Sequence, residues 1–202
     1  MSAEQVVLLD ESGAAVGTTP KAGVHHLDTP LHLAFSCYVF AGDRLLLTRR
    51  AASKTTWPAT WTNTVCGHPG PGERLEDAVR RRAVDELGLE VDDVRLVLPG
   101  FRYRAVMDDG VVENEICPVL VATTSADPVA APDEVDDWTW VEWDELVAGV
   151  LTGERAVSPW CIEQVTALFA LGGSPAEWQT APDAALPPGA RPENHPAVVG
   201  EP

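Results

Sequence analysis

Short apolar runs separated by turn residues fill the first part of the chain, a pattern typical of strands in a sheet. The first run covers residues 5–9 and ends at a polar turn over 10–13. Two further runs, 31–40 and 44–48, flank the turn 41–43. This arrangement predicts a hairpin, because a short Gly-containing turn between two apolar runs brings the strands side by side.

More strands are predicted beyond this hairpin. A shorter run over 57–65 follows a basic loop, and two long extended stretches cover 94–106 and 111–123. The turn 108–110, Asp-Asp-Gly, joins the two long stretches. Alternation of tryptophan with other residues over 138–143 predicts one more strand.

The clearest helix carries an apolar residue at every fourth position, at Leu75, Val79, Ala83 and Leu87. This spacing places all four on one face of a helix. Gly88 follows where a left-handed C-terminal cap belongs. Strands around such a helix predict an α+β fold, an α/β/α sandwich with a mixed sheet flanked by helices.

Two more helices are predicted near the end of this pattern, over 144–151 and 158–171. Ser158 fits the N-cap of the second, with Pro159 at its first helical position. After residue 171 the periodicity stops and Pro, Ala and Gly dominate. We therefore expect one folded domain over 1–171 and a disordered tail over 172–202.

Composition and net charge limit the classes of molecule that this domain is expected to bind. The chain has 202 residues, 45% of them hydrophobic, which suits one domain with a sizeable core. Its net charge of −17 repels nucleic acid and anionic lipid, so neither is an expected partner. Of the 14 Lys and Arg residues, all but Arg155 and Arg191 lie at or before Arg104, so positive charge can gather locally around a small anion.

The cysteines and the N-terminal segment indicate a compartment. Four cysteines occur without any CxxC pair, which favours free thiols in a reducing environment. The N-terminal residues show neither a basic region nor a long apolar core, so we expect no signal peptide and no membrane span. The expected location is the cytoplasm, and the sequence leaves the oligomeric state open.

Histidines and glutamates suggest a metal site. Four of the five histidines lie close together in the sequence: His25, His26, His32 and His68. Glu113 and Glu115 alternate in an apolar strand, so both side chains point the same way and need a cation to relieve their repulsion. Imidazoles with carboxylates suit Mn²⁺, Zn²⁺ or Mg²⁺. A solvated strand face with chance histidines is the alternative.

A glycine-rich loop over 67–73 precedes the predicted helix, which carries Arg81, Arg82, Asp85 and Glu86. The spacing resembles the Nudix box, a loop and helix that hold a divalent metal against a diphosphate. Arg82 and Glu86 are four residues apart and share a helix face, as do Arg81 and Asp85. An ordinary ion-paired helix would show the same spacing.

Four longer stretches and one short one resemble type 1 isopentenyl-diphosphate isomerases, in the order of that family. These stretches are Asp28-Thr-Pro-Leu-His32-Leu-Ala-Phe, Trp61-Thr-Asn-Thr-Val-Cys66-Gly-His68-Pro, Phe101-Arg-Tyr103-Arg-Ala, Val112-Glu113-Asn-Glu115-Ile-Cys-Pro and Ser158-Pro159-Trp160. The family interconverts isopentenyl and dimethylallyl diphosphate on a Nudix-like fold. The resemblance spans roughly residues 4 to 171.

The resemblance implies a role for each matching residue. It assigns one divalent metal to His25, His32, His68, Glu113 and Glu115, with His26 left open as an alternative to His25. It assigns a Mg²⁺ that bridges to the diphosphate to Glu86. Four cations match positions that contact the diphosphate: Lys21, Arg50, Lys54 and Arg82. Cys66 and Glu115 match the proton-transfer pair, with Tyr103 beside them and Trp160 over the reacting carbons.

These residue types suit the chemistry. Protonating an unactivated alkene creates a tertiary carbocation that water would quench, so the site must be dry and hold both an acid and a base. The hydrolase form of the box has glutamates where this chain has Arg82 and Asp85, which favours isomerase over a Nudix-type diphosphate hydrolase, the main alternative. A metal- or nucleotide-binding module without turnover is the third.

Overall fold

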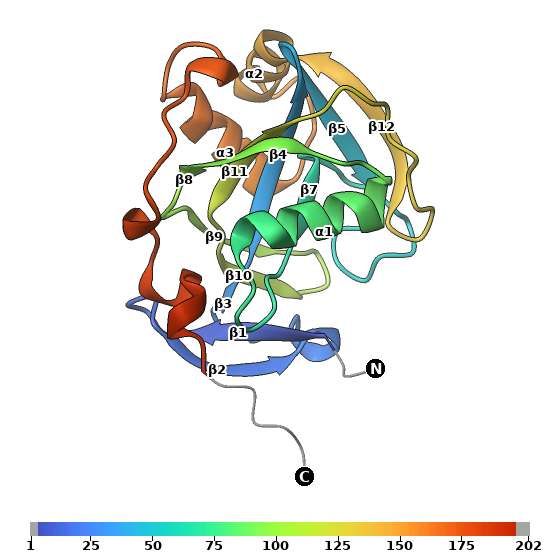
Figure 1. The fold of residues 1–202 in the computed structure, drawn as a ribbon. Coiled ribbons are helices and arrows are strands. Elements are labelled where there is room, and N and C mark those ends of the chain that lie inside the picture. Colours follow the sequence, from blue (N-terminus) through green and yellow to red (C-terminus); the bar gives the residue numbers. More distant parts are fainter. Residues whose placement is uncertain (1–3, 197–202) are drawn as a thin grey trace.

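Two sheets organise the computed structural model, which describes residues 4–196. The smaller one lies at the bottom of Figure 1 and has five strands in the order β2-β1-β3-β10-β9. Its members are β1 (Gln5–Leu9), β2 (Ala15–Pro20), β3 (His32–Leu33), β9 (Arg102–Val106) and β10 (Val112–Ile116). The hydrophobic pattern missed β2, because its small and polar residues are mostly only half-buried.

The larger sheet has seven strands, five of them in the order β12-β5-β4-β11-β8. They are β4 (Phe35–Ala41), β5 (Arg44–Arg50), β8 (Asp92–Leu98), β11 (Val119–Thr123) and β12 (Val135–Glu142). Two short strands outside this order, β6 (Trp61–Thr62) and β7 (Val65–Gly67), pair with the inner strands β5 and β4. β4 and β11 run parallel, whereas the other pairs are antiparallel, which confirms a mixed sheet.

Three stretches predicted as continuous strands are each divided between the sheets. The stretch 94–106 splits at residues 99–101 into β8 and β9. The run 31–40 splits at Ala34 into β3 and β4, and the run 111–123 splits at Cys117 and Pro118 into β10 and β11. Pro118 lacks an amide hydrogen and cannot continue a ladder. The segments 31–40 and 111–123 cross between the sheets side by side. Backbone hydrogen bonds from Ala34 N to Ile116 O (2.9 Å) and from Ser36 N to Pro118 O (3.1 Å) hold them together there.

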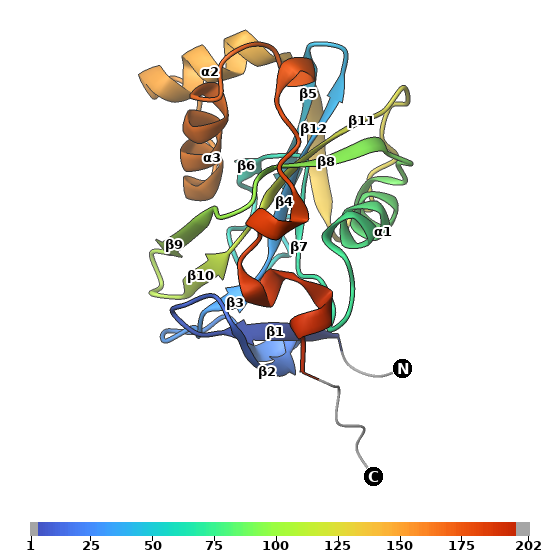
Figure 2. The ribbon, with the colours of Figure 1, turned by 60° about the vertical axis from the view of Figure 1, so that its left-hand side comes forward.

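Helices cover both faces of the larger sheet (Figure 2). Helix α1 (Leu75–Leu87) packs on one face, while α2 (Trp143–Thr152) and α3 (Pro159–Phe169) pack on the other. Strand residues alternate accordingly: Phe35 and Cys37 of β4 join the core beneath α1, whereas Tyr38 and Phe40 join the core beneath α2 and α3. The predicted α/β/α sandwich is confirmed.

The predicted helix signals hold at both marked ends. Gly88 closes α1 in the left-handed conformation, with φ of 59°. The Ser158 hydroxyl accepts from the amide of Cys161 at the start of α3, behind Pro159. Among the described residues, no helix is long and apolar enough to cross a membrane.

The C-terminal segment corrects the expected disordered tail. Residues 172–196 form four 3₁₀ turns and run from the α2–α3 end of the molecule down to β1 and β2 (Figures 1 and 2). Three apolar anchors bury themselves along it: Trp178, Leu186 and Ala190. Composition alone misled here, because a few apolar side chains suffice to hold a Pro-rich segment on a core. Residues 197–202 of the expected tail lie outside the described part.

Trp178 is the strongest anchor, and its removal tests this correction. Its ring meets Trp143 edge-on at 5.2 Å and Phe40 at 6.2 Å, and its indole N–H donates to the carbonyl of Gly172. We expect Trp178→Ala to lower the free energy of unfolding by about 3–5 kcal/mol in urea denaturation. Phe169→Ala, at an exposed aromatic, should cost well under half as much. Equal small losses would contradict the anchoring.

Candidate active site

Three histidines and one glutamate converge where the two sheets meet. The nitrogen and oxygen atoms of His25, His32, His68 and Glu115 lie within 4.8 Å of one another. Glu115 Oε1 is 3.3 Å from the Nε2 atoms of both His32 and His68, and 3.7 Å from that of His25. Parallel pairing of β3 with β10 aligns His32 with Glu115 and so brings together two positions far apart in sequence.

The donor set fits a divalent metal. His32 Nδ1 lies 2.9 Å from the carbonyl oxygen of Pro30, so Nδ1 carries the proton and Nε2 presents a lone pair to the centre. Burial lowers the pKa of His68 to about 4, which keeps this imidazole neutral at pH 7. Among the described residues, buried His25 Nε2 has no hydrogen-bond partner. Such an orphaned lone pair suits a ligand.

His25, and not His26, faces this cluster. Its ring centroid lies 5.2 Å from that of His32 and 5.6 Å from that of His68. His26 is exposed, and its Nδ1 accepts from the amide of Asp28. The structure therefore favours His25 where the sequence left two options open.

Glu113 lies beside the cluster and is linked to Glu115 through Tyr103. The Tyr103 hydroxyl is 2.9 Å from Glu113 Oε2 and 2.8 Å from Glu115 Oε2. Burial and the neighbouring charge of Glu115 raise the pKa of Glu113. Burial also raises the pKa of Glu115, but the three histidines around its Oε1 atom outweigh it and hold that pKa well below its usual range. Glu115 is therefore the anionic member of the pair.

Cys66 is the middle residue of β7 and lines the same cavity as Glu115. Its thiol donates to Asn63 Oδ1 at 3.1 Å and lies 3.4 Å from the hydroxyl oxygen of Ser36. Burial raises the pKa of Cys66 to about 11, so the sulfur holds its proton at pH 7. A neutral, partly buried thiol of this kind can act as an acid toward a bound substrate.

Asn63 is a site residue that the sequence reasoning left without a role. Its amide nitrogen donates to the carbonyls of Cys37 and Val65, which fixes its oxygen toward the cavity. That oxygen accepts from Cys66 and, at 3.1 Å, from the indole N–H of Trp160. Asn63 thus sets the orientation of both groups. The signal in the sequence was its position three residues before Cys66, within the stretch 61–69 that resembles the isomerase family.

Removing the Asn63 amide should impair turnover more than substrate binding. Asn63→Ala leaves the Cys66 thiol and the Trp160 N–H without their acceptor, which costs about 1–3 kcal/mol per unsatisfied buried group. We expect kcat to fall on the order of a hundredfold with KM changed much less, measured by steady-state kinetics alongside a thermal melt. An unchanged kcat in a folded variant would rule out this role.

Aromatic rings form one wall of the site. Trp160 is 2% exposed, and its ring centroid lies 5.7 Å from that of Tyr103. Trp57, which the sequence reasoning did not select, packs edge-on against Trp160 at 5.6 Å. The stack holds Trp160 and Tyr103 in the cavity lining. The rings of Trp160 and Tyr103 therefore lie in the same cavity lining as Cys66 and Glu115.

All four predicted cations line the cavity: Lys21, Arg50, Lys54 and Arg82. Arg82 Nη2 lies 2.7 Å from Glu86 Oε1, which confirms that these two share a helix face. The same nitrogen lies 3.0 Å from Glu134 Oε2, and Lys54 also pairs with Glu134. The sequence reasoning missed Glu134, because it sits in a loop before β12 with no motif around it.

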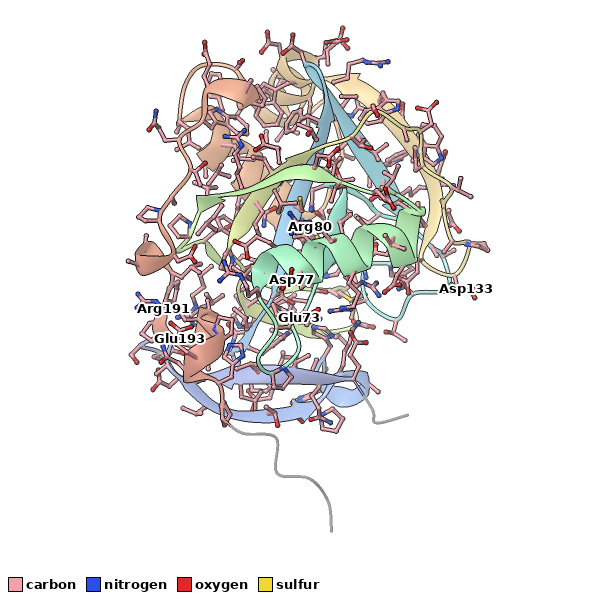
Figure 3. All side chains as sticks on the ribbon, viewed as in Figure 1. Glu73, Asp77, Arg80, Asp133, Arg191 and Glu193 are labelled. Carbon is pink, nitrogen blue, oxygen red and sulfur yellow. The ribbon has the colours of Figure 1, made fainter. Side chains whose placement is uncertain are left out.

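An ion pair between Arg81 and Glu73 holds the glycine-rich loop. Arg81 pairs with Glu73 at 2.8 Å, not with Asp85, and Glu73 also accepts from the amide of Gly70. Figure 3 shows Glu73 in front of the loop that leads into α1. A Cβ at Gly67 would lie 3.1 Å from the Arg82 side chain, so glycine permits this close packing.

The cavity gathers the predicted residues into one place. It has a volume of about 390 Å³, enough for a small diphosphate. Its lining includes Cys66, Glu115, Tyr103, Trp160 and the four cations, together with His25, His68, Glu86 and Glu113. His32 is fully buried directly behind it. Asp85 is exposed on the outer face of α1.

Comparison with known proteins places the chain in a family. Residues 30–161 match the NUDIX domain. The protein of Saccharopolyspora erythraea named Isopentenyl-diphosphate Delta-isomerase is 59% identical over 185 residues, covering 91% of this chain and 95% of that protein. The protein of Rhizobium rhizogenes with the same name is 50% identical over 193 residues, covering 94% and 92%.

Solved structures share the fold at low identity. DR0079 from Deinococcus radiodurans superposes with a TM-score of 0.63 at 20% identity, covering 81% of this chain and 98% of that one. The MutT NUDIX hydrolase from Burkholderia pseudomallei superposes with a TM-score of 0.53 at 19% identity, covering 67% and 96%. These likenesses confirm the fold and leave the chemistry to the site.

Proposed function

The chain belongs to the isopentenyl-diphosphate Delta-isomerases that carry a NUDIX domain, and from this premise we propose that its cavity interconverts isopentenyl and dimethylallyl diphosphate, a step of isoprenoid biosynthesis. One observation carries the proposal. A partly buried thiol, Cys66, and a buried carboxylate, Glu115, line a single cavity with four cations. A thiol and a carboxylate can add and remove a proton, and the four cations can bind the diphosphate of a short ester.

The reaction needs one proton added and another removed. Adding a proton to the terminal CH₂ of isopentenyl diphosphate leaves a tertiary carbocation. Removing a proton from the CH₂ next to the cationic carbon, on its diphosphate side, forms the new double bond. Cys66 and Glu115 serve as this acid and base, and they exchange roles with the direction of reaction. The hydroxyl of Tyr103 holds the Glu115 carboxylate in place.

The aromatic wall protects the cation. The π faces of Trp160 and Tyr103 stabilise a positive charge by about 2 kcal/mol or more when it is desolvated. Burial of both rings also keeps water away from the carbocation. An alcohol by-product is thereby avoided.

The diphosphate supplies binding energy remote from the reacting carbons. Lys21, Arg50, Lys54 and Arg82 provide the positive charge for it, and the high pKa of the guanidinium keeps Arg82 charged. These contacts orient the five-carbon chain between Cys66 and Glu115. Orientation of this kind lowers the barrier by removing motion before the reaction begins.

Divalent metals complete the proposal. His25, His32, His68, Glu113 and Glu115 would hold one ion, Mn²⁺ or Zn²⁺ by their mixed nitrogen and oxygen donors, and Glu86 would hold Mg²⁺ near the diphosphate. A bound cation would lower the basicity of Glu115 and offset the charge of the phosphates. Free thiols at all four cysteines fit a reducing compartment, and we place the enzyme in the cytoplasm.

A diphosphate hydrolase on the same fold is disfavoured by α1. Of the two acids near the end of that helix, Glu86 faces the cavity and Asp85 faces outward. Arg82 replaces a third acid and pairs with Glu86. A hydrolytic site would need these carboxylates to gather metal around the attacked phosphorus.

The test is incubation of the purified chain with isopentenyl diphosphate, Mg²⁺ and Mn²⁺, followed by separate assays of dimethylallyl diphosphate and of released phosphate. Isomer without phosphate supports the proposal, and EDTA should stop its formation. Phosphate release would identify a hydrolase instead. Unchanged substrate with every metal tried would identify a metal- or nucleotide-binding module without turnover.

A further inference from the structure

Glu134 occupies a position that the proposed reaction does not use. Its Oε2 atom accepts from Arg82 Nη2 at 3.0 Å, and the ammonium group of Lys54 pairs with the same oxygen. Two cations assigned to the diphosphate therefore converge on one carboxylate oxygen. Such a geometry is also the one in which a phosphate oxygen binds between two basic side chains.

The remaining cations show how much of the positive charge is already paired. Lys21 pairs with Glu4 at 3.0 Å. Arg50 donates to the carbonyl oxygen and hydroxyl of Thr56. An incoming diphosphate therefore meets a cluster in which Lys54 and Arg82 are both neutralised, and it must compete with a carboxylate for them.

Glu134 and Glu86 both pair with Arg82, but the Glu134 side chain has more freedom to move away from it. Glu86 lies on α1 with a side chain 11% exposed, whereas the side chain of Glu134 is 27% exposed. Glu134 is the last residue before β12, and its backbone is fixed by bonds to Ala131 and Ala51. Its neighbour Asp133 lies at the outer edge of the molecule in Figure 3. The Glu134 carboxylate can therefore turn toward water while its backbone stays in place.

We propose that Glu134 occupies, in the free enzyme, the place between Lys54 and Arg82 that a phosphate group of the substrate takes, and so selects for diphosphates. The inference rests on the proposed function, because it takes Lys54 and Arg82 as the diphosphate subsite. A carboxylate carries one negative charge. A diphosphate carries more charge and more acceptor oxygens, so it displaces Glu134, whereas a single phosphate does so poorly.

Isothermal titration of the full chain in EDTA with inorganic pyrophosphate, and separately with inorganic phosphate, tests this role. The variants are Glu134→Gln and, as the matched control, Asp136→Asn. Asp136 lies two residues away and accepts from the amide of Ala52, outside the cavity lining. The control makes the same change in net charge without freeing Lys54 or Arg82.

We expect Glu134→Gln to bind pyrophosphate on the order of tenfold more tightly than the wild type, because two cations lose their competing carboxylate. Phosphate should gain by a larger factor than pyrophosphate, so the preference for pyrophosphate falls. Asp136→Asn should stay within about twofold of the wild type. Glu134→Ala also removes the carboxylate and should reproduce the gain. Agreement between the two variants shows that the gain comes from the lost carboxylate and not from the new glutamine side chain.

Equal affinities in wild type and Glu134→Gln, including no measurable binding by either, would overturn the inference. Weaker binding by Glu134→Gln would overturn it as well, because Glu134 would then hold the two cations in place for the substrate. Isomer formation by the same wild-type preparation separates the two proposals. Turnover without the gain refutes the role of Glu134 alone, and the gain without turnover refutes the isomerase alone.

Discussion

Cys66→Ala is expected to lower kcat by about 10²–10⁴-fold while the protein keeps its fold and its metal. The Cys66 thiol donates to Asn63, and alanine removes its proton with a small change in volume. The variant loses the proposed proton-transfer group but keeps the cations proposed to bind the diphosphate. Steady-state kinetics with isopentenyl diphosphate measures kcat, and a thermal melt with Mn²⁺ reports fold and metal binding.

Cys37→Ala is the matched control for this loss. Cys37 lies on β4, is fully buried and is absent from the cavity lining. The variant removes the same atoms from the core and should lower stability without a comparable fall in kcat. If both variants lose activity equally, the effect of Cys66→Ala reflects packing, and the assignment of Cys66 to proton transfer fails.

Glu115→Gln is expected to lose both turnover and metal affinity. Its carboxylate accepts from Tyr103 and lies within 3.7 Å of Nε2 of each of the three histidines, so the proposed proton transfer and the proposed metal ligation both depend on it. We expect kcat to fall by at least about 10²–10⁴-fold and metal affinity by roughly 10–100-fold or more. Kinetics measures the first and chelator competition the second.

Glu142→Gln serves as the control for net charge. Glu142 is exposed at the end of β12, outside the cavity lining. It should match the wild type in both measurements. Retained metal affinity in Glu115→Gln would remove Glu115 from the ligand set, and retained turnover would remove it from the proton-transfer pair.

Local pattern predicted much of the fold, because the signals were strong and local. The four-residue apolar spacing from Leu75 to Leu87 located α1, and Gly88 located its end. The placement of strands was less complete. The crossing between sheets at Ala34 and Pro118 depends on pairing between segments some 80 residues apart, and periodicity within one segment does not encode it.

The candidate site was predictable to the extent that short motifs carried it. His32, His68 and Glu115 converge as the resemblance implied, through the register of β3 with β10. Glu134 and Asn63 needed coordinates, since their roles arise from contacts across 52 residues in one case and 97 in the other. The C-terminal segment needed coordinates as well, because Trp178 binds a core built by distant residues.

The fold by itself would have left the reaction open. Neighbours of similar fold include the MutT NUDIX hydrolase from Burkholderia pseudomallei, at 19% identity. The difference lies in side chains: Arg82 beside Glu86, Asp85 facing solvent, and Cys66 facing the cavity. Function is thus decided at the site and not by the architecture.

The most direct test of proton transfer across an intact diphosphate is NMR of the reaction in D₂O. Isopentenyl diphosphate is incubated with the purified chain, Mg²⁺ and Mn²⁺, and both proton and phosphorus spectra are followed. The account predicts dimethylallyl diphosphate with deuterium in the methyl group formed from the terminal CH₂, and no inorganic phosphate. Phosphate release, or an isomer whose new methyl group carries no deuterium, would contradict it.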